Sequence, residues 1–308
     1  MRGMSTLGDV WQQVERLSAD CHDELVPVDD ISFEGLGEVL IAGEAFPLRP
    51  VAQRSLAYRL GIPMNYLARC PLELQAMQMN FWIREERNEK LFFRFDGQAV
   101  RAVFTPRYKP LDNLEVLKRL DQMGHGPDTK VHCALDGEFM SLSIPDEGKT
   151  FELMRDAIVP GISVSNSEVG LASLSISAFF LRLVCTNGLI DRAEVSASFR
   201  HVSLQIMERL PDTIRQVGER MDQGRDRIRV AMDTPVAKPL ATIKALNRQF
   251  NLDKEEQAAV EWAWPAEPGG MMFNVVNAYT RAAQHSGISA EASHRLQRVG
   301  GEILAMIR

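Results

Sequence analysis

Apolar side chains recur every three or four positions near the start of the chain. They are Leu7, Val10, Trp11, Val14 and Leu17. Because an α-helix has 3.6 residues per turn, this spacing predicts an amphipathic helix over residues 5–20, with Ser5 as its cap. Alternation from Ile31 to Leu48 predicts short strands, and three prolines then open short helices. These prolines are Pro50, Pro63 and Pro71.

The middle of the chain follows the two-residue period of β-strands, which predicts two hairpins. They are residues 91–104 with Asp96-Gly97 at the turn and residues 131–144 with Asp136-Gly137 at the turn. Residues 161–169 and 171–185 are rich in small and β-branched side chains, which is typical of central strands. We therefore expect a hairpin-rich, antiparallel central sheet.

Helical patterns dominate after Phe199, first from about His201 to Met232 and then to Arg308. Central strands with helices at both ends predict the α+β class, with flanking helices and a helical C-terminal subdomain. We place a soft boundary near residue 234. Residues 1–234 then form an α+β core domain with an acidic N-terminal segment, and residues 235–308 form the helical subdomain.

Acidic side chains are concentrated near the start of the chain. Residues 5–48 carry ten acidic residues and one basic residue, a net charge of −9, whereas the whole chain carries −6. The other residues therefore sum to +3. Such a segment suits a partner surface or an oligomer contact, and the overall acidity argues against indiscriminate nucleic-acid binding.

Several classes of protein are disfavoured by the sequence. No stretch reaches the roughly 18 apolar residues of a membrane span, and residues 1–4 lack the apolar region of a secretory signal. We expect a cytoplasmic protein with no membrane partner. The four cysteines form no C-x-x-C pair, so we expect no metal site and no cofactor.

Signatures of common catalytic centres are also missing. The sequence has no P-loop, no dinucleotide-binding glycine motif, no H-E-x-x-H and no nucleophile elbow. We expect a protein that binds a polymer and is not an enzyme. An active site assembled in the fold from dispersed residues stays open as an alternative. Its members would be His132, Glu168, Asn187 and His201.

Basic and aromatic residues gather in the first hairpin and the loop after it. Arg94 and Arg101 occupy positions from which both side chains can flank one surface of the hairpin, and Arg107, Tyr108 and Lys109 follow directly. Cations beside an aromatic ring suit a phosphate backbone with a stacked base. The structural alternative is a pair of arginines on a solvated sheet face, which is common.

Two further basic segments follow. Arg182 lies in an apolar strand, where a charge is costly unless it is paired, and Glu168 on the preceding strand is its candidate partner. Arg225, Arg227 and Arg229 can reach a phosphate, although mixed charge along that helix is typical of a solvated face.

Several short motifs stand in the order seen in one protein family. They are Gly61-Ile62-Pro63 with Tyr66, Val100 to Val103, Arg107 to Asn113, Ser167 to Gly170, Arg182 to Leu189, and Arg200-His201. Over roughly residues 25–235 the chain resembles the phage- and plasmid-like proteins that carry domain of unknown function nine-three-two, with the C-terminal helices outside the match. In its hairpin-rich core followed by a long helix, that family is distantly similar to ring-forming single-strand annealing recombinases.

The resemblance implies an ATP-independent protein of DNA recombination. It would bind single-stranded DNA in a local basic groove and anneal strands as a homo-oligomer, with a ring as the closed form. The carried-over nucleic-acid-binding residues are Arg94, Arg101, Arg107, Tyr108, Lys109, Arg182, Arg200 and His201. The alternative is a regulatory or protein-interaction factor of a mobile element, which binds a host protein through the acidic segment without direct nucleic-acid contact.

Overall fold

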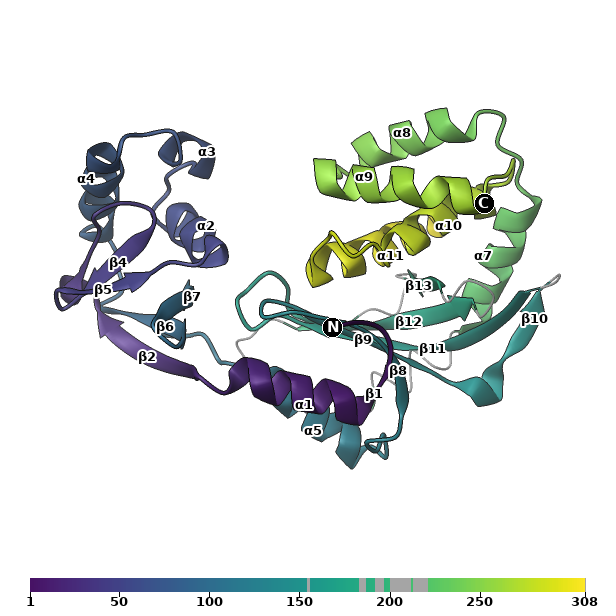
Figure 1. Cartoon of the computed structure of the whole chain (residues 1–308), viewed down its shortest axis with the longest axis horizontal. Helices are drawn as coiled ribbons and strands as arrows, with labels where there is room; N and C mark the ends of the chain where they lie inside the picture. Colours follow the sequence, from purple (N-terminus) through teal and green to yellow (C-terminus); the bar gives the residue numbers. More distant parts are fainter. Residues whose placement is uncertain (154–155, 183–186, 192–196, 200–211, 213–220, 308) are drawn as a thin grey trace.

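The computed structural model describes residues 1–307 apart from 154–155, 183–186, 192–196, 200–211 and 213–220. These residues form three antiparallel sheets with helices on both sides of them in the sequence, which confirms the α+β class. Figure 1 shows two lobes: a smaller one from the early part of the chain, and a larger one that holds the largest sheet.

The smaller lobe contains two three-stranded sheets and three helices. One sheet is β2 (Cys21–Pro27), β6 (Lys90–Asp96) and β7 (Ala99–Phe104), and the other is β3 (Ile31–Ser32), β4 (Glu38–Ile41) and β5 (Glu44–Pro47). The helices are α2 (Pro50–Arg59), α3 (Met64–Leu67) and α4 (Leu72–Ile83). Each begins at or directly after a predicted proline, because proline presets φ and lacks the amide that a first helical turn leaves unbonded.

The larger lobe is organised around an eight-stranded sheet. Its main path runs β1 (Arg2–Thr6), β8 (Lys130–Leu135), β9 (Met140–Pro145), β11 (Asp156–Asn166), β12 (Leu174–Arg182) and β13 (Asn187–Asp191). β10 (Phe151–Leu153) pairs with β11, and β14 (Ala197–Phe199) pairs with β12. Both predicted hairpins are present, as β6–β7 and β8–β9. The edge strand β1 was not predicted, because its five residues show no alternation of apolar positions.

Helices cover the large sheet and share its core. In Figure 1, α1 (Leu7–Ser18) and α5 (Asn113–Gln122) lie below the sheet. Above it lie α8 (Pro239–Gln249), α9 (Lys254–Ala263), α10 (Met272–Ala282) and α11 (Ala290–Met306), which follow α7 (Met221–Asp233). One hydrophobic cluster joins Val10, Leu142 and Val276, so residues 235–308 pack on the sheet. Whether they also form an independent subdomain stays a prediction.

Some predicted limits of elements differ from the structure. Most of the helix expected from about residue 201 falls on residues outside the described part of the chain, and α7 is described from Met221. Asp112 occupies the N-cap position of α5 as predicted, but its side chain does not cap the helix. The described residues include no helix that combines the length and apolar character needed to cross a bilayer.

Replacing Gly161 by alanine is expected to destabilise the large sheet. Gly161 lies opposite Pro145 of β9, and an added Cβ would lie 2.8 Å from the Pro145 Cα, with the Ile144 carbonyl oxygen closer still. Because both obstacles are backbone atoms, β9 and β11 must separate, and we expect the free energy of unfolding to fall by about 3 kcal/mol. The measurement is urea denaturation followed by circular dichroism.

Gly126→Ala is the control for this substitution, since a Cβ at Gly126 meets nothing within 4 Å. Equal unfolding midpoints for the two variants would contradict the close approach of β9 and β11.

Candidate functional site

An open cleft of about 900 Å³ lies between the two lobes. Its walls come from the ends of α2 and α4, the end of β7 and the turn between β11 and β12. The lining residues are Ser55, Tyr58, Arg59, Leu60, Gly61, Trp82, Glu85, Glu86, Arg87, Val103, Phe104, Val169 and Gly170. A concave site of this size at the junction of two lobes is the usual location of a binding site.

Three aromatic side chains line the cleft, and two of them present ring surface to solvent. Tyr58 is 89% exposed and Trp82 is 44% exposed. Phe104 differs, because its ring stacks on Tyr108 with centroids 3.8 Å apart and planes 5° apart. On the turn, a Cβ added to Gly170 would lie 2.7 Å from the Phe104 ring. Phe104 is therefore a packed wall, whereas Tyr58 and Trp82 are accessible.

The charges at the cleft are partly paired. Arg59 Nη1 lies 3.3 Å from Glu86 Oε2. Burial acts to raise the pKa of Glu86, but hydrogen bonds from Asn88 and Arg59 outweigh it and hold the pKa below its ordinary value. Arg87 and Glu85 are exposed at the same rim. The cleft thus combines two accessible rings with two guanidiniums, one of which is already neutralised.

A buried carboxylate, Glu168, holds the β11–β12 turn against the smaller lobe. Its Oε2 is paired with Arg101 Nη2 of β7, and its Oε1 accepts a hydrogen bond of 2.6 Å from the Asn113 amide at the start of α5. Its backbone carbonyl accepts from Arg94 Nη1 at 3.1 Å and from the Tyr108 hydroxyl at 3.4 Å. One residue therefore connects β6, β7, the following loop and α5.

Arg94 completes this network with two more carboxylates. Its Nε donates to Asp23 Oδ1 at 2.8 Å, and its Nη2 donates to Asp112 Oδ1 at 2.5 Å. Burial alone would lower the pKa of Arg94, but Asp112 and Asp23 outweigh burial and raise it, so the guanidinium stays charged. Asp112 fails to cap α5 because its carboxylate is engaged here.

The expectation that Arg94 and Arg101 flank an open surface is wrong. Both residues are only 4% exposed and lie in internal ion pairs. The alternation of the hairpin places their side chains correctly on a face. Alternation within the hairpin cannot show that the loop after β7 and the β11–β12 turn cover that face.

The other predicted binding residues are not gathered into one trough. Arg107 and Lys109 are exposed, and Tyr108 between them is half-buried, with its pKa raised to about 12 by burial. Arg182 pairs with Glu267, not with Glu168 as predicted, and its guanidinium also lies over the Phe273 ring. Arg200 and His201 lie outside the described residues.

The dispersed residues of the enzyme alternative are also separated where they are described. Glu168 belongs to the interlobe network, whereas His132 lines a different cavity at the β1 edge of the large sheet. His201 lies outside the described residues, as does the side chain of Asn187. Among the described residues, no group of three His, Cys, Asp or Glu side chains could hold a metal ion.

Sequence reasoning missed Tyr58 and Trp82. A signal existed for Trp82: α4 is apolar on nearly every side, and such a helix is either buried or presents a contact surface. In the structure Leu72, Met77 and Phe81 of α4 are exposed together with Trp82. Tyr58 carries no comparable signal, because a lone aromatic residue at a helix end is ordinary.

Glu168→Gln is expected to lower the free energy of unfolding by about 3 kcal/mol. The substitution keeps the shape of the side chain but leaves the buried Arg101 guanidinium without its anion, which is costly. Glu115→Gln is the matched control, since Glu115 forms an exposed pair with Lys118 and should change little. Urea denaturation of both variants measures the difference, and a small effect at Glu168 would contradict its structural role.

Comparison with known proteins identifies a family. The family described as Domain of unknown function (DUF932) matches residues 100–299. The predicted resemblance is right in family but not in extent, because the match takes in α8 to α10 and leaves out residues 25–99. No curated protein and no solved structure matches the chain. Since the match spans more than half of the sequence, this protein belongs to the family of proteins with a Domain of unknown function (DUF932).

Proposed function

We propose that this protein binds single-stranded nucleic acid in the interlobe cleft, with single-stranded DNA as the preferred ligand. The observation that carries the proposal is the combination of accessible Tyr58 and Trp82 rings with Arg59 and Arg87 in one open cleft. Aromatic rings stack on bases of any sequence, and cations beside them follow the phosphate backbone. Recognition of this kind needs no catalytic residue and no nucleotide hydrolysis.

The loop after β7 does not line the cleft, but it adds cations next to the Phe104 wall. Arg107 and Lys109 are exposed on either side of Tyr108, whose ring stacks on the Phe104 wall. Arg94, Arg101 and Tyr108 are positioning residues, because they hold Glu168 and with it the β11–β12 turn that forms one wall of the cleft. The acidic residues of segment 5–48 repel phosphates from much of the smaller lobe, which favours binding confined to the cleft.

An open stacking site is suited to strand annealing. A base that stacks on Tyr58 or Trp82 uses its face, so its hydrogen-bonding edge stays available to a second strand. The protein would then hold a strand extended, delay its self-pairing and release it as a duplex, without ATP. We therefore propose a role in DNA recombination of a phage- or plasmid-like element, as the resemblance described in the sequence analysis implies.

Binding of a fluorescein-labelled single-stranded oligonucleotide tests the site. We expect Tyr58→Ala and Trp82→Ala each to weaken binding roughly tenfold, because each removes one base-stacking surface. Arg107→Ala combined with Lys109→Ala should reduce the slope of log affinity against log salt by about 1.4, since each lost phosphate contact contributes about 0.7. Fluorescence anisotropy at several salt concentrations measures both effects.

Trp262→Ala is the matched control, because Trp262 is 49% exposed but lies on α9 in the larger lobe. Binding that is absent, insensitive to salt, or equally weakened by Trp262→Ala contradicts the proposed cleft. A parallel titration with RNA of the same sequence decides between the two nucleic acids. Absent binding would favour the protein-interaction alternative.

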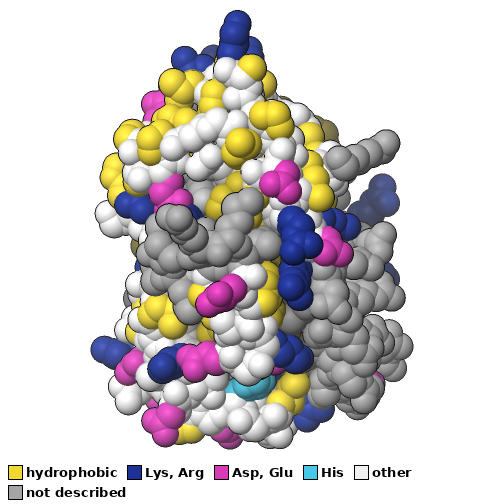
Figure 2. All heavy atoms as spheres, turned by 90° about the vertical axis from the view of Figure 1, so that its right-hand side faces the viewer, with side chains coloured by type: hydrophobic (Ala, Val, Ile, Leu, Met, Phe, Trp, Pro, Cys, Tyr) yellow, Lys and Arg dark blue, Asp and Glu magenta, His cyan; other side chains and the backbone are white. Residues whose placement is uncertain are grey.

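We propose further that the protein self-associates head to tail. Helix α4 lies at one end of the molecule in Figure 1, and its Leu72, Met77 and Phe81 are exposed. Exposed Leu240 and Met306 lie on α8 and α11, above the large sheet. Residues 221–249 carry six basic and three acidic residues, opposite in sign to the acidic segment 5–48. Figure 2 shows the right-hand side of Figure 1, where Lys and Arg side chains lie beside hydrophobic ones, with Asp and Glu side chains among them. Two different complementary surfaces on one chain generate a ring if the rotation closes.

Substitutions on α4 test the self-association. Met77→Asp and Phe81→Asp, at residues 60% and 58% exposed, should reduce the oligomer to a monomer, because they place a charge in the apolar contact. Trp262→Asp is the control, as Trp262 is 49% exposed on α9, outside α4 and outside both charged segments. Light scattering coupled to size-exclusion chromatography measures the mass. A wild-type monomer at all protein concentrations contradicts the proposal.

A further inference from the structure

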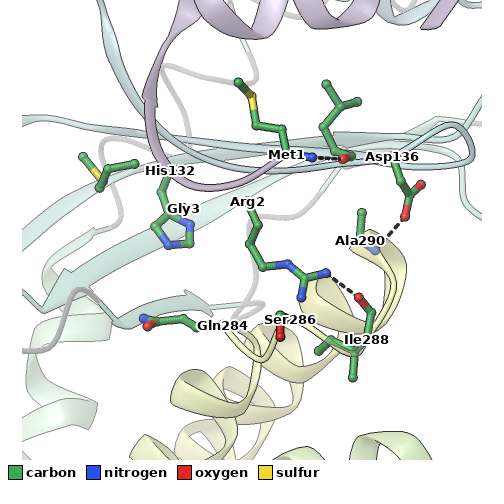
Figure 3. A pocket seen from close by; sticks show the side chains of 11 residues that line it. Met1, Arg2, Gly3, His132, Asp136, Gln284, Ser286, Ile288 and Ala290 are labelled. Atoms are coloured by element: carbon green, nitrogen blue, oxygen red, sulfur yellow. Dashed lines mark hydrogen bonds between the residues drawn. The ribbon is translucent and has the colours of Figure 1, made fainter.

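A second cavity, of about 540 Å³, lies at the β1 edge of the large sheet. Arg2 of β1 and His132 of β8 enter it from the sheet, and Gln284 and Ser286 face them from the loop between α10 and α11 (Figure 3). Met4, Leu135 and Ile288 supply apolar lining. The cavity shares no lining residue with the interlobe cleft, so an inference about it does not depend on the proposed function.

Arg2 brings into this cavity a positive charge that lacks an ion pair. Its Nη2 donates to the carbonyls of Ile288 and Ser289 at 2.6 and 3.0 Å, and its Nη1 donates to the carbonyl of His285. Carbonyl oxygens carry no net charge, and no carboxylate in the described part of the chain forms an ion pair with Arg2. Burial lowers the pKa of Arg2, and the more distant Asp136 offsets that effect only partly. A half-buried cation of this kind favours an anion beside it.

Asp136 is prevented from serving as that anion by its own hydrogen bonds. Its Oδ2 accepts from the Ala290 amide at 2.8 Å, at the start of α11. Its Oδ1 accepts from the amides of Glu138 and Phe139 at 3.0 and 2.9 Å. Three backbone amides therefore hold the carboxylate at the rim of the cavity, turned away from Arg2 (Figure 3).

His132 presents a buried polar ring without a hydrogen-bond partner. It is only 6% exposed, its ring points into the cavity in Figure 3, and no described residue makes a hydrogen bond to that ring. Burial, together with the charge of Arg2, lowers its pKa to about 4. The ring is therefore neutral at pH 7 and offers one N–H donor to a molecule in the cavity.

We propose that this cavity binds the phosphate group of a small organic phosphate of mononucleotide size. A phosphate group offers several acceptor oxygens, so it can neutralise Arg2 and accept from the His132 ring and the Ser286 hydroxyl at once. The cavity is larger than an inorganic phosphate requires, and its apolar lining suits an attached ring system. The same group occurs on a free mononucleotide and at the 5′ end of a DNA strand, and the test below separates the two sources.

Nuclear magnetic resonance of the full chain with ¹³C-labelled histidine tests the proposal. The chain has six histidines, and His132→Gln assigns the relevant ring signal. We expect deoxyadenosine monophosphate to shift this signal and to raise the His132 pKa by about one unit, because an anion offsets the charge of Arg2. Deoxyadenosine, which lacks the phosphate, should leave the signal unchanged. Besides Arg2, the charged side chain that lines the cavity is Asp136, which is the same in both titrations.

Arg2→Gln should weaken binding of the monophosphate at least about tenfold, since it removes a charged hydrogen-bond partner. Arg16→Gln, at an exposed position on α1, is the matched control. A stronger response to a 5′-phosphorylated oligonucleotide than to the monophosphate identifies the strand end as the source, and the reverse identifies a free metabolite. An unmoved His132 signal at millimolar monophosphate, or equal responses to the monophosphate and deoxyadenosine, overturns the proposal. Tyr58→Ala should leave this site intact, which separates its failure from that of the interlobe cleft.

Discussion

The ion pair between Glu168 and Arg101 is the contact on which the meeting of the two lobes depends. Glu168 lies in the turn between β11 and β12, whereas Arg101 lies on β7, and α5 begins against the same carboxylate. Arg94 adds two further carboxylates, so two guanidiniums are balanced by three acids, of which Glu168 is buried and Asp23 and Asp112 are partly exposed. Separating the lobes would part the buried Arg101 from Glu168, which costs several kcal/mol. The network therefore keeps the turn against Phe104 and gives the cleft a defined wall.

This arrangement changes how the charge of the protein relates to its proposed activity. The acidic surplus of the first segment led us to expect a local basic trough. In the structure, Arg94 and Arg101 are buried in internal ion pairs, whereas Arg107 and Lys109 are exposed to solvent. Binding in the cleft would therefore draw more on stacking than on a dense positive field, and a modest salt dependence is consistent with it. The cavity at the β1 edge differs from the cleft, because Arg2 there is bonded to carbonyl oxygens and lacks an ion pair.

The sequence predicted the elements better than the surfaces. Regular spacing from Leu7 to Leu17, the three prolines and the two Asp-Gly turns each depend on neighbours within a few residues, and the corresponding helices and hairpins are present. The partner of Arg182 could not be predicted in this way, because Glu267 lies far along the chain. Arg94 and Arg101 were correctly predicted to lie on one face of the hairpin, but that face was expected to be open and is buried. Tyr58 and Trp82 were missed because exposure is a property of the assembled lobes.

The sequence by itself determined the α+β class, the order of most helices and strands, the acidic first segment and the family, since each of these follows from local periodicity, composition or short motifs. Only the tertiary structure decided which charged groups are buried, which aromatic rings are accessible and which residues share a cavity. The physical reason is that a cleft or an ion pair joins residues separated by tens to hundreds of positions. Their contact depends on how sheets and helices pack, and a local pattern carries no record of that packing.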